Sequence, residues 1–264
     1  MARPVVALLS DFGTRDHYVG AMKGVILGIC PDATLVDISH DIPAHDVLTA
    51  GLELAATYRY FPAGSVFLVV IDPGVGSERR GVAADTGDYR FVAPDNGVLT
   101  AVLNESPPRR VVELTERRYA RPTVSRTFEG RDRFAPAAAW VAKGVQLSAL
   151  GRPVTDYRTL DLPVPELATD RIVGCVLRVD RFGNLVSNID RKTFDRLAQQ
   201  GSIQIEVGPH GIDRLVETYA DIGEDEVCAL FGSTEHLEFA ANSTRAVERL
   251  GVERGDAVVV RQDQ

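Results

Sequence analysis

Residues 5–13 of the chain, VVALLSDFG, decide the fold, because a continuous apolar run ends there at a polar segment with a glycine. Such a run is typical of a strand buried on both faces, and the polar residues after it indicate a loop at the carboxyl end of the strand. The next segment ends before Pro31 and spaces its apolar residues as on one face of a helix: Met22, Val25, Ile26 and Ile29. The sequence therefore predicts a strand followed by a helix.

The same alternation continues through the first 160 residues. The patterns predict further strands at residues 34–38, 66–71, 89–93 and 111–114, and helices at residues 46–60 and 135–143. Alternating strands and helices predict an α/β domain with a mainly parallel sheet and helices on both faces. In such sheets ligands bind beyond the carboxyl ends of the strands, and Asp11 and Asp72 each follow a buried strand.

The character of the sequence changes after Gly151. Pro163 and Pro165 suit an extended linker. Beyond them, short β-like segments separated by turn residues predict a smaller all-β barrel or sandwich: residues 174–179, 185–189, 203–207, 227–231, 237–240 and 257–260. We therefore expect an α/β domain at residues 1–160, a linker at residues 161–172 and a β domain at residues 173–264.

Composition limits the classes of function. The 264 residues are 45% apolar and 25% charged, which is typical of a soluble globular protein. A net charge of −8 and the absence of a Lys/Arg run argue against a nucleic-acid partner. The three cysteines form no C-x-x-C pair, so free thiols are expected rather than disulfides or a zinc site. Because the first apolar stretch is too short for a signal peptide or a membrane span, we expect a cytoplasmic protein with no membrane partner.

Four polar clusters interrupt apolar surroundings: residues 10–13 (SDFG), 72–80 (DPGVGSERR), 128–132 (FEGRD) and 180–184 (DRFGN). Singly, each has an ordinary structural explanation. Asp11 suits a helix cap or turn, Arg131-Asp132 an ion pair, and residues 180–184 a hairpin corner. The loop at residues 72–80 is glycine-rich but lacks the Lys-Ser/Thr ending of a phosphate-binding P-loop.

In their order and spacing, and with residues 93–97 (APDNG) between them, these clusters resemble the S-adenosyl-L-methionine hydroxide adenosyltransferases. These are the adenosine-forming S-adenosylmethionine hydrolases, which are related to fluorinase and chlorinase. The resemblance covers nearly the whole chain. It implies hydrolysis of a small-molecule substrate, S-adenosyl-L-methionine, to adenosine and L-methionine without a cofactor or a metal. It also implies a homotrimer whose active sites lie between the first domain of one subunit and the second domain of its neighbour.

The resemblance also assigns residues. The family's aspartate at the position of Asp11 binds the ribose hydroxyls, a role that suits a carboxylate because it can accept from both members of a cis-diol. The aspartate and arginine of the family's water-handling triad fall on Asp72 and Arg79. The adenine and methionine ends of the substrate are assigned to four residues of the second domain: Asp180, Phe182, Asn184 and Ser233. Thr234 stands where the halogenases carry arginine.

The third triad residue departs from the family pattern. The family has histidine in a Phe-His-Gly-Arg-Asp string, and this chain has Glu129 there. An ionised carboxylate only accepts hydrogen bonds, whereas a neutral imidazole accepts one and donates another. We therefore expect Glu129 to take the third catalytic position and to serve it less well than histidine.

Three alternatives remain open. A halogenase is the nearest, but the fluorinase and chlorinase carry tyrosine at the position of Asp72, and a carboxylate there would repel a halide and suit water. Glu129 leaves open a non-catalytic trimer that binds S-adenosylmethionine or adenosine. A metal-dependent phosphoesterase would use four carboxylates: Asp11, Asp72, Asp95 and Asp132. The sequence lacks the histidine-carboxylate pattern that is typical of such a metal site.

Overall fold

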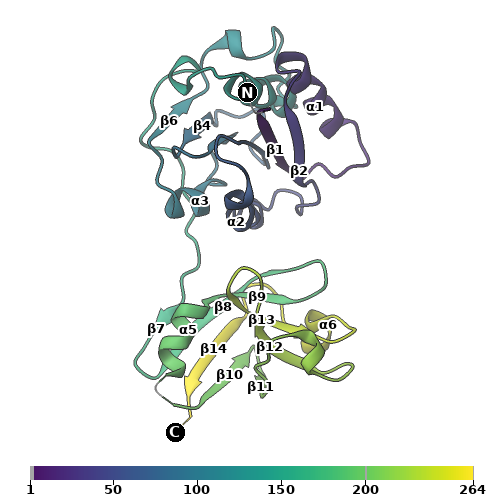
Figure 1. Cartoon of the computed structure of the whole chain (residues 1–264), viewed down its shortest axis with the longest axis vertical. Coiled ribbons are helices and arrows are strands. Elements are labelled where there is room, and N and C mark those ends of the chain that lie inside the picture. The colour runs from purple at the N-terminus through teal and green to yellow at the C-terminus, as the bar shows by residue number, and fades with distance from the viewer. Residues whose placement is uncertain (1–2, 200, 264) are drawn as a thin grey trace. The chain divides into compact units, whose positions relative to one another are not determined.

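The computed structural model describes residues 3–199 and 201–263 of the chain. They form two compact units, of which the first ends at Asp161 and the second begins at Leu162 (Figure 1). The predicted linker at residues 161–172 contains strand residues, namely β7 (Glu166–Leu167) and the start of β8 (Arg171–Val179). These two strands pair antiparallel, which extends the β structure to within a few residues of the prolines.

A six-stranded sheet in the order β2-β1-β3-β5-β4-β6 forms the centre of the first unit. Its strands are β1 (Val5–Ser10), β2 (Thr34–Ser39), β3 (Val66–Val70), β4 (Gly81–Asp85), β5 (Arg90–Pro94) and β6 (Arg110–Glu113). Every described residue of β1 after Val5 is buried, so this strand has apolar neighbours on both faces as its sequence predicts.

The sheet is mixed, which corrects the prediction of a mainly parallel sheet. β1 is parallel to β2 and β3, and β3 is parallel to β5, but β4 pairs antiparallel with both β5 and β6. Residues 86–89 alone connect β4 to β5. A parallel pair needs a crossover of about a dozen residues or more, so this short connection requires a hairpin. The broader prediction of an α/β unit is confirmed.

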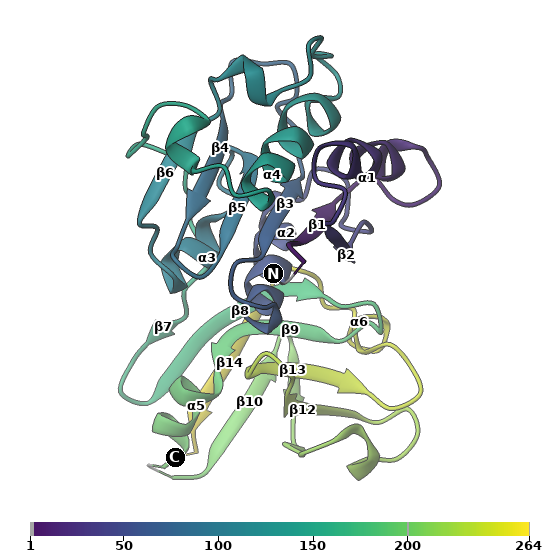
Figure 2. The ribbon, with the colours of Figure 1, turned by 45° about the horizontal axis from the view of Figure 1, so that its top comes forward.

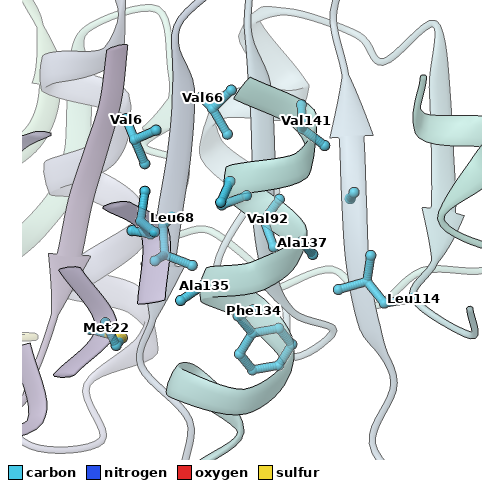
Figure 3. Close-up of a cluster of buried hydrophobic side chains, with 14 of the residues drawn as sticks. Val6, Met22, Val66, Leu68, Val92, Leu114, Phe134, Ala135, Ala137 and Val141 are labelled. Carbon is cyan, nitrogen blue, oxygen red and sulfur yellow. The ribbon is translucent and has the colours of Figure 1, made fainter. Parts of the chain in front are cut away.

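Helices flank this sheet. They are α1 (Tyr18–Ile29), α2 (Val47–Thr57), α3 (Thr100–Glu105) and α4 (Ala135–Ala142). α4 packs against α1 and against β1, β3 and β5, whereas α2 packs against α3 and β1. A π-helical turn, η3 (Gly130–Phe134), leads directly into α4. Figure 3 shows side chains of η3 and α4 facing those of the central strands in a hydrophobic core: Phe134, Ala135, Ala137 and Val141 with Val6, Val66, Leu68 and Val92.

The second unit is built around one antiparallel sheet in the order β11-β10-β14-β8-β9-β13-β12, with β7 paired to β8. The remaining strands are β9 (Leu185–Asp190), β10 (Ile203–Val207), β11 (His210–Ile212), β12 (Val227–Phe231), β13 (His236–Ala241) and β14 (Ala257–Gln262). β11 and β12, the two ends of this path, also contact each other, so the sheet curls into a nearly closed barrel. The predicted β class of this unit is confirmed.

Two short helices, missed in the sequence, complete the second unit. α5 (Arg191–Ala198) packs on β8, β9 and β14, and α6 (Ala246–Leu250) packs on β13 (Figure 2). α5 begins at Asp190, whose side chain accepts a hydrogen bond from the Thr193 amide, an ordinary N-cap. Within residues 3–199 and 201–263, no helix combines the length and the apolar character needed to cross a membrane.

Candidate active site

Arg79 holds Asp72 through a two-pronged ion pair. Its Nε donates to Asp72 Oδ1 at 2.6 Å, and its Nη2 donates to Asp72 Oδ2. Asp72 follows the end of β3, and Arg79 comes later in the same glycine-containing loop. A planar fork to a carboxylate is a geometry that arginine makes and lysine does not. The structure therefore brings these two predicted site residues together.

Glu129 joins this pair from the turn before η3. Its Oε2 accepts from Arg79 Nη2 at 2.8 Å and from Arg133 Nη1 at 3.3 Å. Among the residues that the structure describes, no hydrogen bond reaches the other oxygen, Oε1. The three residues expected in the water site thus form one connected network, with Arg79 in the middle.

Arg79 is almost completely enclosed. Its side chain is 5% exposed and that of Asp72 is 6% exposed, while its guanidinium lies 5.1 Å from the ring centre of Phe134. Burial by itself would lower the pKa of Arg79, but the hydrogen bonds and charges of Asp72 and Glu129 outweigh burial and raise it. In the part of the chain that the structure describes, the buried Nη1 finds no hydrogen-bond partner. A buried donor of this kind normally has a hydrogen-bond partner, which can be an ordered water.

Asp11 leaves the sheet at the same edge as Asp72. β1 and β3 are parallel with Ser10 opposite Val70, so the residues that follow these positions emerge next to each other. Asp11 Oδ2 accepts from the His45 amide at 2.9 Å. No hydrogen bond from residues 3–199 or 201–263 reaches Oδ1, which leaves that oxygen available to a ligand.

The loop that carries Asp11 is fixed by the buried residue His40. Its Nδ1 lies 2.7 Å from Ser10 Oγ, and its carbonyl accepts from the Gly13 amide at 2.7 Å. Its Nε2 lies 3.1 Å from Asp37 Oδ1. Ser10 is completely buried and the His40 side chain is 2% exposed, so these two residues shape the loop, whereas the Asp37 side chain is 42% exposed.

An aromatic contact links the Asp11 loop to the segment before Glu129. Phe12 and Phe128 meet edge to face with ring centres 5.9 Å apart, and Tyr18 packs on both rings. Such pairs add specific geometry to apolar burial. The neighbours of Asp11 and of Glu129 in the sequence are therefore in direct contact.

In the second unit, Asp180 closes the turn between β8 and β9. Its carboxylate accepts from the amides of Phe182 and Asn184 and from Asn184 Nδ2, each at 2.9 Å. Gly183 has φ of 86°, a backbone conformation that favours glycine. The turn presents Phe182, which is 76% exposed, while Asn184 is buried. Asp180 thus has a structural role here, and Phe182 has a face free for stacking.

Ser233 lies at the opposite end of β9 from this turn. It belongs to the turn between β12 and β13, and His236 after it pairs with Asp190 at the far end of β9, whereas Phe239 pairs with Leu185. Ser233 is exposed, and Thr234 Oγ1 is buried without a partner among the residues that the structure describes. The structure therefore groups Asp180, Phe182 and Asn184 in one turn and places Ser233 in the turn between β12 and β13, where Gly232 before it lies against Glu238.

Two charged residues beside these groups, Arg133 and Glu238, were not predicted from the sequence. Arg133 lies four residues after Glu129, one helical turn away, a spacing that indicates contact. Glu238 interrupts the apolar strand β13 and is buried, and a Cβ on Gly232 would lie 1.9 Å from its Oε1. Burial raises the pKa of Glu238, Arg178 lowers it and Asp180 raises it further. A lone carboxylate within an apolar strand was the available signal.

Two of the carboxylates that a metal site would use, Asp95 and Asp132, bind arginine side chains and backbone amides instead. Asp95 binds Arg80 and the Arg158 amide. Asp132 accepts from Arg131 and from the Ser125 amide. Across residues 3–199 and 201–263, no group of three or more His, Cys, Asp or Glu side chains is arranged to hold a metal ion.

Comparison with protein families matches both units. Residues 6–151 match the SAM hydroxide adenosyltransferase N-terminal domain, and residues 174–259 match the C-terminal domain of the same family.

Comparison with individual proteins agrees with this match. The chain is 36% identical to an (R)-S-adenosyl-L-methionine hydrolase of Salinispora tropica, over 97% of each chain. It is 37% identical to one of Thermus thermophilus, over 96% of this chain and 97% of that one. It is 29% identical to a fluorinase of Nocardia brasiliensis, over 98% and 97%. A crystal structure of an uncharacterized conserved protein from Thermotoga maritima superposes with a TM-score of 0.92 at 34% identity, covering 97% of this chain and all of that one.

Proposed function

The chain belongs to the SAM hydroxide adenosyltransferase family, and we propose that it hydrolyses S-adenosyl-L-methionine to adenosine and L-methionine by attack of water at C5′. The observation that carries this proposal is the enclosed network of Asp72, Arg79 and Glu129, in which Arg79 Nη1 is buried without a partner in the described chain. That nitrogen is a place for one ordered water.

The substrate supplies its own leaving group. The water oxygen forms a bond to C5′ as the bond from C5′ to sulfur breaks, and the electron pair of the broken bond stays on sulfur. The sulfonium becomes the neutral thioether of methionine, so no proton has to be delivered to it. One proton of the attacking water is lost. The protein therefore has to bind, orient and activate the water, and placement alone supplies up to about 7–11 kcal/mol in favourable systems.

Each member of the network has a part in this step. Arg79 donates from Nη1 to the water oxygen and favours its hydroxide character, because a guanidinium stays charged. Asp72 fixes the plane of that guanidinium through both of its oxygens. Glu129 accepts a proton of the water through Oε1, the oxygen that no described residue occupies. No metal or cofactor takes part.

The remaining predicted residues bind the substrate. Asp11 binds the ribose hydroxyls through its unoccupied Oδ1, and the exposed ring of Phe182 stacks on adenine. Asn184 and Asp180 shape the turn that presents Phe182, and Asp180 also attracts the amino group of the methionine part. Ser233, in the turn between β12 and β13, contacts the methionine end.

We also assign the protein to the cytoplasm and to a homotrimer. The trimer follows from the family resemblance, in which each active site takes its groups from two subunits. A cytoplasmic location is supported by the three cysteines, which are all free thiols, the state that a reducing compartment maintains.

The test is to incubate purified protein with S-adenosyl-L-methionine and to separate the products by chromatography over several hours. Each sulfonium epimer is assayed separately, because the relatives are named for the (R) form. We expect adenosine and methionine in equal amounts, and loss of both with Asp72→Asn. Formation of 5′-chloro-5′-deoxyadenosine in chloride would show a halogenase instead, and binding without products would show a non-catalytic binding protein.

A further inference from the structure

Arg133 supplies a second guanidinium to Glu129. Its Nη1 lies 3.3 Å from Glu129 Oε2, the same oxygen that accepts from Arg79 at 2.8 Å. We propose that Arg133 is a positioning residue of the water site, which holds Glu129 and offsets its charge, so that Glu129 and Arg133 together replace the histidine of the family. The proposal rests on the function proposed above.

The charges of the site support this assignment. Asp72, Arg79 and a neutral histidine would carry no net formal charge at pH 7. Glutamate in place of that histidine adds one negative charge beside side chains that are 5% and 6% exposed. An unbalanced charge in such surroundings is costly because water cannot solvate it. Arg133 returns the sum to zero.

Arg133 is fixed at its other end by the main chain. Its Nη2 donates to the carbonyl of Leu114 at 2.8 Å, just after β6. Its guanidinium also lies against β4, since a Cβ on Gly81 would be 3.3 Å from Arg133 Cζ. An arginine held in this way presents Nη1 at a set place, so little rotamer freedom remains to be lost when it meets Glu129.

An ordinary ion pair between residues four apart on a helix would explain why Arg133 contacts Glu129. It would not explain why the contact is largely buried and shares an oxygen with Arg79. Exposed pairs of that kind contribute little and concern stability alone. Here the side chains of Glu129 and Arg133 are 13% and 21% exposed, and the shared oxygen also holds Arg79 Nη2. A displaced Glu129 therefore changes the surroundings of the guanidinium that binds the water.

Glu129 and Arg133 both line a pocket of about 330 Å³ in the first unit. Shorter or uncharged side chains at these positions can therefore be hydrated without collapse of the core. This makes both positions suitable for substitution.

The test is a double-mutant cycle of Glu129→Gln and Arg133→Gln, with kcat and KM measured for hydrolysis of S-adenosyl-L-methionine. In the parent, we expect Arg133→Gln to lower kcat about tenfold and to change KM less than about twofold. In the Glu129→Gln protein the same change should alter kcat less than about twofold, because the charge that it offsets is gone. Arg133→Lys should keep kcat within about threefold of the parent.

Arg152→Gln is the matched control. Arg152 Nε lies 2.8 Å from Glu113 Oε2, and the Glu113 side chain is 13% exposed, as is that of Glu129. This variant removes an ion pair to an equally buried glutamate of the same unit, although Arg152 itself is 72% exposed, and should leave kcat unchanged. Urea unfolding is measured for every variant to check that each variant protein is folded.

Histidine at position 129 provides a second test of the same proposal. Glu129→His alone leaves Arg133 and Arg79 facing a neutral ring with an excess positive charge. We expect Glu129→His combined with Arg133→Gln to exceed Glu129→His alone about tenfold in kcat.

Equal losses from Arg133→Gln in both backgrounds, or a change in KM alone, would overturn the assignment of Arg133. So would a Glu129→His protein that matches the double variant. In each of these cases the parent still forms adenosine and the proposed function stands. A parent that forms no adenosine would instead refute the proposed function, and the positioning role with it.

Discussion

At the scale of single residues, Arg79 carries two tasks with different N–H groups. Nε and Nη2 hold the two carboxylates, and the buried Nη1 has no partner in the part of the chain that the structure describes. Lysine has one nitrogen and no planar fork, so it cannot hold Asp72 and present a second donor at a fixed place. Burial lowers the pKa of Arg79, but Asp72 and Glu129 together raise it above its usual value, so the guanidinium is charged at neutral pH.

We therefore expect Arg79→Lys to lower kcat by at least about a hundredfold with a small change in KM. A loss of this size in kcat is typical when an enzyme loses one hydrogen-bond donor that stabilises the transition state. Steady-state kinetics check this. Arg80→Lys is the control, because the neighbouring Arg80 also makes a branched set of ion pairs, with Asp95 and Asp156, outside the water site. A raised KM with an unchanged kcat would assign Arg79 to substrate binding.

Glu238 predicts a dependence of stability on pH. The pKa of Glu238 is raised in the folded protein, mainly by burial, so folding favours the neutral carboxyl group over the ionised one. That stabilisation is complete below the unfolded pKa, about 4.3, and is lost as pH rises through the folded pKa. Glu238→Gln, which is neutral at every pH, should be more stable than the parent at pH 7, and the difference should shrink toward about pH 4.3.

Urea unfolding at several pH values measures this difference, and the exposed Glu224→Gln serves as the control. A variant that is less stable than the parent at pH 7 would mean that the Glu238 carboxylate is held by favourable contacts that outweigh its burial.

At the scale of elements, β4 and η3 flank the network of Asp72, Arg79 and Glu129 from two sides. Gly81 opens β4, and a Cβ there would lie 2.5 Å from Phe134 Cε1 and 3.3 Å from Arg133 Cζ. Phe134 in turn covers the Arg79 guanidinium. Close packing of this strand against η3 thus requires the smallest residue at position 81.

Gly81→Ala should lower the free energy of unfolding by about 1–3 kcal/mol, the usual cost of overpacking, and should also lower kcat by shifting Phe134 and Arg133. Gly24→Ala is the matched change, because a Cβ there meets nothing within 4 Å on the exposed side of α1. It should raise stability by about 0.5–1 kcal/mol without affecting kcat. If Gly81→Ala were as stable and active as Gly24→Ala, η3 would not depend on the fit to β4.

The sequence predicts those elements whose pattern is local. β1 and β3 are continuous apolar runs, and α1 carries a clear helical spacing, so each is evident from its own residues. β4 was missed because its apolar run follows the polar loop at residues 72–80 directly. α5 and α6 are short, and the contacts that stabilise them lie in distant strands. The mixed pairing of the sheet depends on the hairpin that this missed strand makes.

The candidate site shows the same division. Asp72, Arg79 and Glu129 could be selected from motif order, and they are bonded to one another in the structure. The spacing of Arg133 from Glu129 indicates contact, but the position of its guanidinium depends on the Leu114 carbonyl and on Gly81, both far away in the sequence. Residues 180–184 were predicted as a hairpin corner, but the hydrogen bonds of the Asp180 carboxylate within that turn were not.

At the scale of the whole molecule, the proposed trimer predicts complementation between damaged subunits. Asp72→Asn damages the first unit, and Phe182→Ala removes an exposed ring from the second unit. If each site takes its groups from two subunits, co-expression of the two variants in equal amounts should restore about a quarter of the parent activity. Each variant alone should remain inactive or nearly so.

The activity of separately tagged, co-purified mixtures measures this restoration. The control is a mixture of Asp72→Asn with Arg79→Lys, two changes in the same unit, which should restore nothing. Restoration in neither mixture would place each site within one subunit.

Hydrolysis in oxygen-18 water, with mass spectrometry of both products, tests whether water attacks at C5′. We expect one oxygen-18 atom in adenosine, at the 5′-hydroxyl, and none in methionine. Unlabelled adenosine, or label in methionine, would contradict it.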